Sequence, residues 1–269
     1  MPPATTLPDL LEDLAQEQAA LDDLVTGLPE DGWDTATPAE GWAVRDQISH
    51  LAYFDAMATM AIREPERFAT HAEQATARAM AGDDPMAEHL ARGRAMTGEQ
   101  LLSWWRAARQ DLLGAASALE AGTRVPWYGP PMSPLSFVSA RLMETWAHGQ
   151  DVVDALGVTR EPTRRLAHVA QIGVRARPFS YLVRGLDPPA AGVRVELRSP
   201  DGEAWSWDDD VTGDVVCGPA LDFCLVVTQR RHLDDTELVV EGPIAEEWMH
   251  IAQAFAGPPG PGRQPLERS

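Results

Sequence analysis

Apolar residues recur at three- and four-residue spacing in four segments of the N-terminal part of the chain, the pattern of amphipathic helices. The segments cover residues 6–26, 44–63, 97–122 and 133–157. Thr6 and Thr97 suit the caps of the first and third, and Ser133-Pro134 opens the fourth in the order that helix starts prefer. Residues 64–96 are polar and Ala-rich, which predicts a shorter helix and a mobile connection around GDDP. The pattern favours an all-α four-helix bundle over residues 5–158.

After GVTREP the pattern changes to shorter segments. Residues 163–178 predict a helix that ends at Pro178, and GVRVELRSPDGEAWSWDDD predicts a hairpin around a Ser-Pro-Asp-Gly turn. GDVVCGPALDFCLVVTQRR predicts a strand and an apolar helix, TELVVEG a strand, and PIAEEWMHIAQAF a last helix. Together they indicate a small α+β domain over residues 163–256. The Pro- and Gly-rich tail, residues 257–269, is expected to be disordered.

Charge and composition narrow the classes of partner. The formal charge of −19 repels phosphate backbones, so no nucleic-acid partner is expected. No apolar run approaches the roughly 20 residues of a membrane span, and no basic-then-apolar leader is present, so we expect a cytoplasmic protein without a membrane partner. All 22 basic residues are Arg, which suggests a high-GC genome of the actinobacterial kind. Cys217 and Cys224 match no metal or redox spacing and are interpreted as reduced core cysteines.

One histidine interrupts the apolar stripe of the second predicted helix. In GWAVRDQISHLAYFD, His50 falls on the inner face, where its ring nitrogens need partners. RLMETWAHGQDVV, in the fourth helix, places Glu144 and His148 one turn apart on one face. Two imidazoles and one carboxylate with an open position are typical of a catalytic zinc site. His50, Glu144 and His148 are therefore candidate metal ligands, with core polar groups that satisfy one another as the alternative.

The spacing alone is weak support, because the chain repeats it. EEWMH places Glu246 and His250 four residues apart, a pair that we interpret as solvated. Asp46 and His50 share the spacing too. The candidate ligands differ from these pairs in context, since all three fall in long helices of one predicted bundle.

Two motifs and the C-terminal region resemble a known family. WAVRDQISHLAYFD resembles the first metal motif of DinB-like bundles, and METWAHGQDVVDALG resembles the last motif of the mycothiol-dependent maleylpyruvate isomerase branch. The region around GPALDFCLVVTQRR is similar to the sterol-carrier-like α+β domain of that branch. The resemblance covers nearly all of the chain expected to be ordered. It implies that His50, Glu144 and His148 bind a divalent metal, most simply Zn²⁺.

The resemblance also implies an activity. A metal with an open position activates a water or captures a thiolate, and in the resembled branch the thiol is mycothiol. The hypothesis is a zinc-dependent isomerase or transferase in which the metal-bound mycothiol thiolate adds to an electrophilic small molecule. A zinc hydrolase is one alternative, disfavoured because the His-Glu-x-x-His motif is missing. The other is a non-catalytic, metal-stapled small-molecule carrier.

Other residues carry secondary hypotheses. Asp151, three residues after His148, could orient an imidazole or simply be solvated. Arg230 falls where the branch carries an arginine linked to activity, so it could hold an anionic substrate group over the metal. Arg231 rivals it, and both could instead complement the end of a helix.

The remaining aromatic residues and histidines suggest packing more than chemistry. Trp42 and Trp146 are interpreted as core residues, and Trp127 and Tyr128 as possible lining of a pocket mouth. Four histidines have no partner that the sequence identifies: His71, His89, His168 and His250.

Overall fold

The structure is a computed structural model that describes residues 5–266, and it divides into two compact units. Residues 5–159 form a helical unit, and the described residues from 160 onward form a second unit built around a sheet. Each unit is described by itself.

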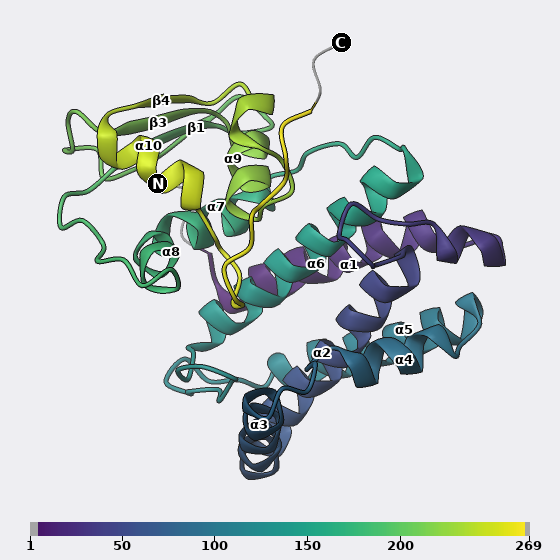
Figure 1. The fold of residues 1–269 in the computed structure, drawn as a ribbon. Coiled ribbons are helices and arrows are strands. Elements are labelled where there is room, and N and C mark those ends of the chain that lie inside the picture. Colours follow the sequence, from purple (N-terminus) through teal and green to yellow (C-terminus); the bar gives the residue numbers. More distant parts are fainter. Residues whose placement is uncertain (1–4, 267–269) are drawn as a thin grey trace. The chain divides into compact units, whose positions relative to one another are not determined.

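Four long helices make the helical unit: α1 (Leu7–Val25), α2 (Val44–Arg63), α5 (Gly98–Ala116) and α6 (Pro134–Leu156). In Figure 1, α1 and α6 run side by side, and α2 packs against α5 as well as α6. Thr6 and Thr97 both form capping boxes, as their positions predicted. The predicted all-α bundle is confirmed.

The core of the bundle is formed by residues of α1, α2 and α5 and by the C-terminal part of α6. Trp33, in the short 3-10 helix η1 (Glu30–Asp34), closes it on one side. The cluster consists of Leu21, Val25, Trp33, Val44, Ile48, Leu51, Ala52, Leu101, Leu102, Trp105 and Val152. Burial of this apolar surface stabilises the packing of α2, which carries His50.

The segment between α2 and α5 is more regular than predicted. It forms two helices, α3 (Pro65–Met80) and α4 (Ala87–Arg94), and the GDDP connection spans residues 81–86. α5 ends at Ala116, earlier than the predicted residue 122. The chain leaves the helix there and soon pairs Val125 with Met132 in a two-residue bridge that closes the proline-rich loop.

The second unit contains a four-stranded sheet in the order β2-β1-β3-β4. Its strands are β1 (Arg194–Arg198), β2 (Ala204–Trp207), β3 (Val215–Pro219) and β4 (Val239–Glu241). β1 pairs antiparallel with β2 and parallel with β3, and β3 pairs antiparallel with β4. The accompanying helices are α7 (Leu166–Arg175), α8 (Arg177–Leu182), α9 (Ala220–Val227), η2 (Leu233–Asp235) and α10 (Pro243–Ile251). The predicted α+β class is confirmed.

Two local predictions in this unit had different outcomes. The predicted hairpin turn forms, with the Gly202 amide donating to the Ser199 carbonyl at 3.0 Å. The prediction that Pro178 ends a helix is wrong, because Pro178 lies in the first turn of α8. Proline is tolerated there since the first-turn amides have no partner within the helix.

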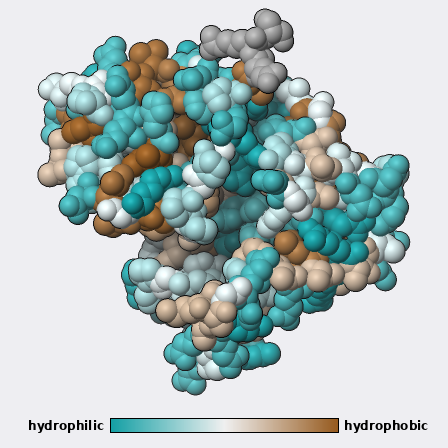
Figure 2. All heavy atoms as spheres, viewed as in Figure 1, coloured by the Kyte–Doolittle hydropathy of each residue, from teal (hydrophilic) through white to brown (hydrophobic). Residues whose placement is uncertain are grey.

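On the face that Figure 2 shows, the brown hydrophobic groups are larger on the sheet unit than on the helical unit. No helix among the described residues combines the length and apolar character that a membrane span requires. Residues 257–266 form neither helix nor strand, and the Leu266 amide donates to Asp235 at 2.9 Å. The last three residues of the predicted disordered tail lie outside the described residues.

Candidate metal centre

Three side chains from α2 and α6 converge inside the helical unit. His50 comes from α2, and Glu144 and His148 lie one turn apart on α6. One ligand atom from each lies within 4.8 Å of the other two. The Nε2 atoms of His148 and His50 lie 3.3 and 3.9 Å from Glu144 Oε2. The structure thus brings together the three residues that the sequence singled out.

A buried ion pair fixes the two helices at this level. Arg141, three residues before Glu144, donates to the Asp55 carboxylate at 2.9 and 3.1 Å, and Asp55 lies five residues after His50. Both side chains are buried, so the pair is shielded from water. Burial raises the pKa of Asp55, and Arg141 opposes that shift. The pair sets the register of α2 against α6, and hence the position of His50 opposite Glu144.

A chain of hydrogen bonds determines which nitrogen of His148 is free. The Thr37 hydroxyl donates to the Trp42 carbonyl at 2.9 Å and accepts from the Gln47 amide nitrogen at 2.9 Å. The Gln47 carbonyl oxygen therefore faces His148 Nδ1, 2.5 Å away, and that nitrogen must carry the proton. His148 consequently presents the lone pair of Nε2 to Glu144 and His50.

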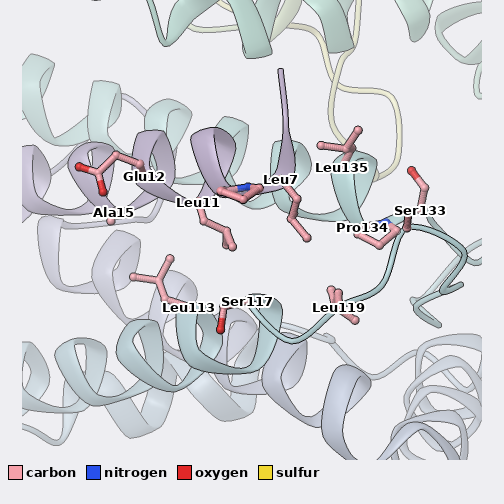
Figure 3. Close-up of a pocket in the computed structure, with 12 residues that line it drawn as sticks. Leu7, Leu11, Glu12, Ala15, Leu113, Ser117, Leu119, Ser133, Pro134 and Leu135 are labelled. Atoms are coloured by element: carbon pink, nitrogen blue, oxygen red, sulfur yellow. The ribbon is translucent and has the colours of Figure 1, made fainter. Parts of the chain in front are cut away.

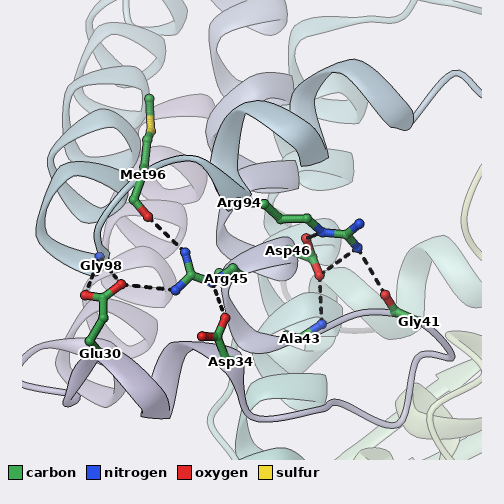
Figure 4. A network of polar contacts seen from close by, with 9 residues as sticks. All are labelled: Glu30, Asp34, Gly41, Ala43, Arg45, Asp46, Arg94, Met96 and Gly98. Carbon is green, nitrogen blue, oxygen red and sulfur yellow. Dashed lines mark hydrogen bonds and ion pairs between the residues drawn. The ribbon is translucent and has the colours of Figure 1, made fainter.

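Two arginines anchor the start of α2, as Figure 4 shows. Arg45 donates to Asp34 at 2.6 Å, to Glu30 at 3.1 Å and to the Met96 carbonyl at 2.9 Å. Arg94 of α4 donates to Asp46 at 2.8 and 3.1 Å. Both interactions fix the turn of α2 that leads to Gln47 and His50.

Asp46 also closes the first turn of α2 on itself. Its carboxylate accepts the Ala43 amide at 2.9 Å and is held on its other side by Arg94 (Figure 4). Asp46 is therefore engaged at the helix start, although it shares the four-residue spacing to His50.

The two histidines lie between aromatic rings. Trp42 stacks on His148, with centroids 6.0 Å apart and an interplanar angle of 15°, and lies 5.4 Å from the ring of His50. Phe54 packs against His50, with the two ring centroids 4.5 Å apart. Trp42 thus lines the candidate metal centre, whereas Trp146 is buried in the core as expected.

Burial and mutual proximity favour the metal-binding forms of these groups. Burial and the neighbouring His148 lower the pKa of His50 to about 3, so its imidazole is neutral at pH 7. Burial alone would raise the pKa of Glu144, but the neighbouring His148 and His50 hold it well below its usual value. A neutral imidazole at His50 beside an ionised carboxylate at Glu144 is the pair of protonation states that a bound cation requires of these two groups.

The spacing of the donor atoms fits a small divalent cation. Zinc bonds of about 2.0–2.1 Å in tetrahedral geometry separate neighbouring ligand atoms by about 3.3 Å. The two separations from Glu144 are 3.3 and 3.9 Å, so small side-chain movements suffice. The side chains of His50, Glu144 and His148 retain 13%, 22% and 11% of their exposure, so the centre is mostly buried but not sealed from solvent.

Two other predicted residues are not among the three converging donors. Asp151 is buried on α6, one turn beyond His148, while the acceptor on His148 Nδ1 is Gln47. Arg230 belongs to the sheet unit and follows α9, where its guanidinium donates to the Thr228 carbonyl at 2.6 Å. The roles of Asp151 and Arg230 therefore stay predictions.

Several residues near the centre have partners that could not be read from the sequence. His71 Nε2 lies 3.1 Å from the Tyr53 hydroxyl, and the ring of His89 stacks on Tyr53. Trp127 and Tyr128 pack against Phe54 and one another. Tyr53 and Phe54 fall within the motif LAYFD directly after His50, a signal that could have marked them as neighbours.

Two hollows of the helical unit are distinct from the triad. Figure 3 shows an apolar groove of about 640 Å³ between α1, the end of α5 and the start of α6. It is lined by Leu7, Pro8, Leu11, Glu12, Ala15, Leu113, Ser117, Leu119, Ala121, Ser133, Pro134 and Leu135. A second hollow of about 660 Å³ includes Trp42, Leu90 and Arg94. Among the described residues, those that line the groove of Figure 3 include no cluster of potential metal donors.

Fold and site together define the class of protein: a helical bundle in which three candidate metal donors converge, in a chain that also contains a small α+β unit. The family model described as the Mycothiol maleylpyruvate isomerase N-terminal domain matches residues 14–153. The chain belongs to this family, as its motifs predicted, and is an enzyme of the isomerase or transferase type.

Relatives and solved structures extend the match over most of the chain. Uncharacterized proteins from two Mycobacterium tuberculosis strains, CDC 1551 / Oshkosh and ATCC 25618 / H37Rv, are each 45% identical over 251 residues, covering 93% of this chain and 96% of theirs. The crystal structure of the mycothiol-dependent maleylpyruvate isomerase aligns with a TM-score of 0.58 at 16% identity, covering 89% of this chain and 97% of that one. A histidine-to-alanine mutant of that enzyme gives 0.57 at the same identity and coverage. At this identity the structures support the fold.

Proposed function

We propose that the chain is a divalent-metal-dependent enzyme that activates a low-molecular-weight thiol, mycothiol, for addition to an electrophilic small molecule. His50, Glu144 and His148 would hold the cation, with zinc as the metal that best suits two imidazoles and one carboxylate. The observation that carries the proposal is the convergence of three donor atoms within 4.8 Å in a centre whose side chains keep some exposure to solvent. Family membership supports mycothiol as the thiol.

The metal's contribution is to lower the pKa of a thiol, ordinarily about 8.5, so that the thiolate forms at neutral pH. The residues of the chain prepare the place for it. Gln47 holds the proton on His148 Nδ1, and Trp42 and Phe54 cover the imidazole faces. These contacts keep the donors fixed before the thiol arrives, which limits the reorganisation needed during reaction.

The proposed reaction of the thiol requires neither an oxidant nor a reductant. The thiol loses its proton, and a sulfur lone pair forms a bond to an electrophilic carbon while the π electrons of the substrate move to the conjugated oxygen. Expulsion of the thiolate after rotation about the new single bond restores the double bond and gives isomerisation. If the carbon–sulfur bond is retained and the carbon is protonated, the outcome is S-transfer.

Two further residues are proposed to take part. Arg230 would hold an anionic group of the substrate, and Asp151 would support α6 at the ligand turn. Changing Arg230 to Met should raise KM for an anionic electrophile, with zinc content unchanged. Unaltered turnover in that variant would remove Arg230 from the proposal.

The direct test is calorimetry of mycothiol binding to the zinc-loaded protein, together with the visible spectrum of the cobalt-substituted protein. We expect binding and a sulfur-to-cobalt charge-transfer band. S-methyl mycothiol, which cannot form a thiolate, is the matched control and should give no band. Failure of mycothiol to bind and to change the spectrum would refute the thiol proposal.

A further inference from the structure

His89, on α4, is a buried histidine with an unsatisfied nitrogen. The residue is 2% exposed, and its Nε2 has no hydrogen-bond partner among the described residues. Buried polar atoms of this kind are rare, because each costs the hydration that it has lost. An unpartnered buried nitrogen beside a candidate active centre calls for a ligand.

α4 holds His89 firmly in place against α2. The Ser49 hydroxyl donates to the His89 carbonyl at 2.7 Å, and Ser49 directly precedes the candidate ligand His50. One turn later, Gly93 lies so close to Ser49 that an added Cβ would be 2.5 Å from the Ser49 Cβ and Oγ. Only glycine permits this approach, so the position of His89 next to the triad is built into the packing.

The ring of His89 completes the aromatic surroundings of the triad without joining its donor atoms. It stacks on Tyr53 at 4.6 Å and 10°, and lies 5.6 Å from the ring of His50. Its nitrogens are not among the ligand atoms within 4.8 Å of one another. A histidine ring that carries its proton on Nε2 can donate one hydrogen bond from that atom.

We propose that His89 donates a hydrogen bond from Nε2 to an oxygen of the small molecule bound at the triad, and so acts as a binding residue rather than a metal ligand. The proposal rests on the proposed function in that it takes the triad to be where a small molecule binds. The oxygen could belong to the thiol cosubstrate or to the electrophile, and the two sources share this chemistry.

Two substitutions test the contribution of the Nε2 donor and that of the aromatic ring of His89 separately. His89→Phe keeps a ring that can stack on Tyr53 but removes the donor, whereas His89→Gln removes the ring and places an amide nitrogen near the position of Nε2. If His89 binds a ligand, Gln should be the better replacement. If His89 only packs, Phe should be the better one.

The measurement is calorimetry on the zinc-loaded full chain with two probes. Mycothiol represents the thiol, and acetohydroxamate represents an oxygen-bearing ligand of the open position. For at least one probe we expect His89→Phe to raise Kd about tenfold or more, and His89→Gln to stay within about threefold of the parent. An effect on mycothiol alone assigns the oxygen to the thiol, and an effect on acetohydroxamate assigns it to the electrophile.

The controls separate this proposal from the function on which it rests. His71 also touches Tyr53, but its Nε2 is already paired with the Tyr53 hydroxyl, so His71→Phe should leave both Kd values unchanged.

Failure of mycothiol to bind the parent would refute the thiol function, while the acetohydroxamate comparison still tests His89. The proposal is overturned if His89→Phe binds both probes as well as His89→Gln does, if both variants lose their zinc, or if neither probe binds the parent. Should the Phe variant not fold, His89→Met replaces it in the same comparison.

Discussion

Two helices of this chain place a glutamate one turn before a histidine, and only one of these pairs forms part of a candidate metal centre. On α6, Glu144 and His148 face a third donor, His50, from the neighbouring helix α2. On α10, His250 is exposed and its Nδ1 lies 2.7 Å from the backbone carbonyl of Glu246. The described residues around the α10 pair offer no third donor within the same distance.

The difference shows that surroundings, more than spacing, make the pair on α6 a possible metal site. Burial keeps the imidazole of His50 neutral, and Gln47 fixes the tautomer of His148. The pair on α10 lacks such an orienting side chain, since its imidazole is engaged by its own helix backbone. Each prediction below removes one feature that distinguishes the α6 pair.

The largest effect is expected from breaking the ion pair that holds α6 against α2. Arg141→Met leaves the carboxylate of Asp55 buried without its partner, which should lower the free energy of unfolding by about 3–5 kcal/mol. Chemical denaturation of the metal-free protein measures it. The matched control is Arg67→Met, which removes an exposed pair with Glu64 and should cost at most about 1 kcal/mol. An equal loss of unfolding free energy in the two variants would contradict the proposed role of the Arg141–Asp55 ion pair in holding α6 against α2.

Acid should destabilise the metal-free protein through His50. The pKa of His50 falls from 6.5 to about 3 on folding, so below pH 6.5 the unfolded chain binds a proton that the folded chain does not. Stability from this group is therefore complete above pH 6.5 and is lost as pH falls toward 3, at about 1.4 kcal/mol per pH unit. His50→Gln should reduce the slope of unfolding free energy against pH between about 6.5 and 5 by one proton. The exposed His250→Gln should keep the parent slope, and an unchanged slope in His50→Gln would disprove the assignment.

A smaller effect is expected from removing the acceptor on His148. Gln47→Met cannot hold the Nδ1 proton, so zinc affinity should fall about 10- to 100-fold. Gln47→Glu keeps an acceptor oxygen and should bind zinc more tightly than Gln47→Met does. Competition with a zinc-binding dye measures both. If the Met variant matched the parent, Gln47 would have no part in orienting the ligand.

The smallest effect should follow from loosening the start of α2. Arg94→Met removes the partner of Asp46, but Arg94 is half exposed, so we expect a loss of at most about 1 kcal/mol in unfolding free energy. Zinc affinity should change by less than threefold, because Asp46 still accepts the Ala43 amide. A larger loss of zinc affinity would show that the helix start controls the centre directly.

The sequence was sufficient for the parts of the molecule that depend on local periodicity. Apolar spacing predicted the four bundle helices, and a Ser-Pro-Asp-Gly turn predicted the β1–β2 hairpin. The resemblance of two motifs to a known family also singled out His50, Glu144 and His148, and the structure brings these three together. The proline rule misplaced Pro178, because proline both ends helices and begins them.

The supporting residues could not be predicted, since their partners lie far away along the chain. Gln47 meets His148 across 101 residues, and Arg141 meets Asp55 across 86. Neither pair has a characteristic spacing within one helix. His89 was equally hidden, because its place depends on the contact of Gly93 with Ser49 between α4 and α2.

The zinc content of three purified proteins tests the central claim most directly: the parent, His148→Ala and His250→Ala. Each protein is stripped of metal, reloaded with zinc, dialysed and assayed by atomic emission. The account predicts one equivalent of zinc in the parent and in His250→Ala, and none in His148→Ala. Zinc retained by His148→Ala, or missing from the parent, would contradict it.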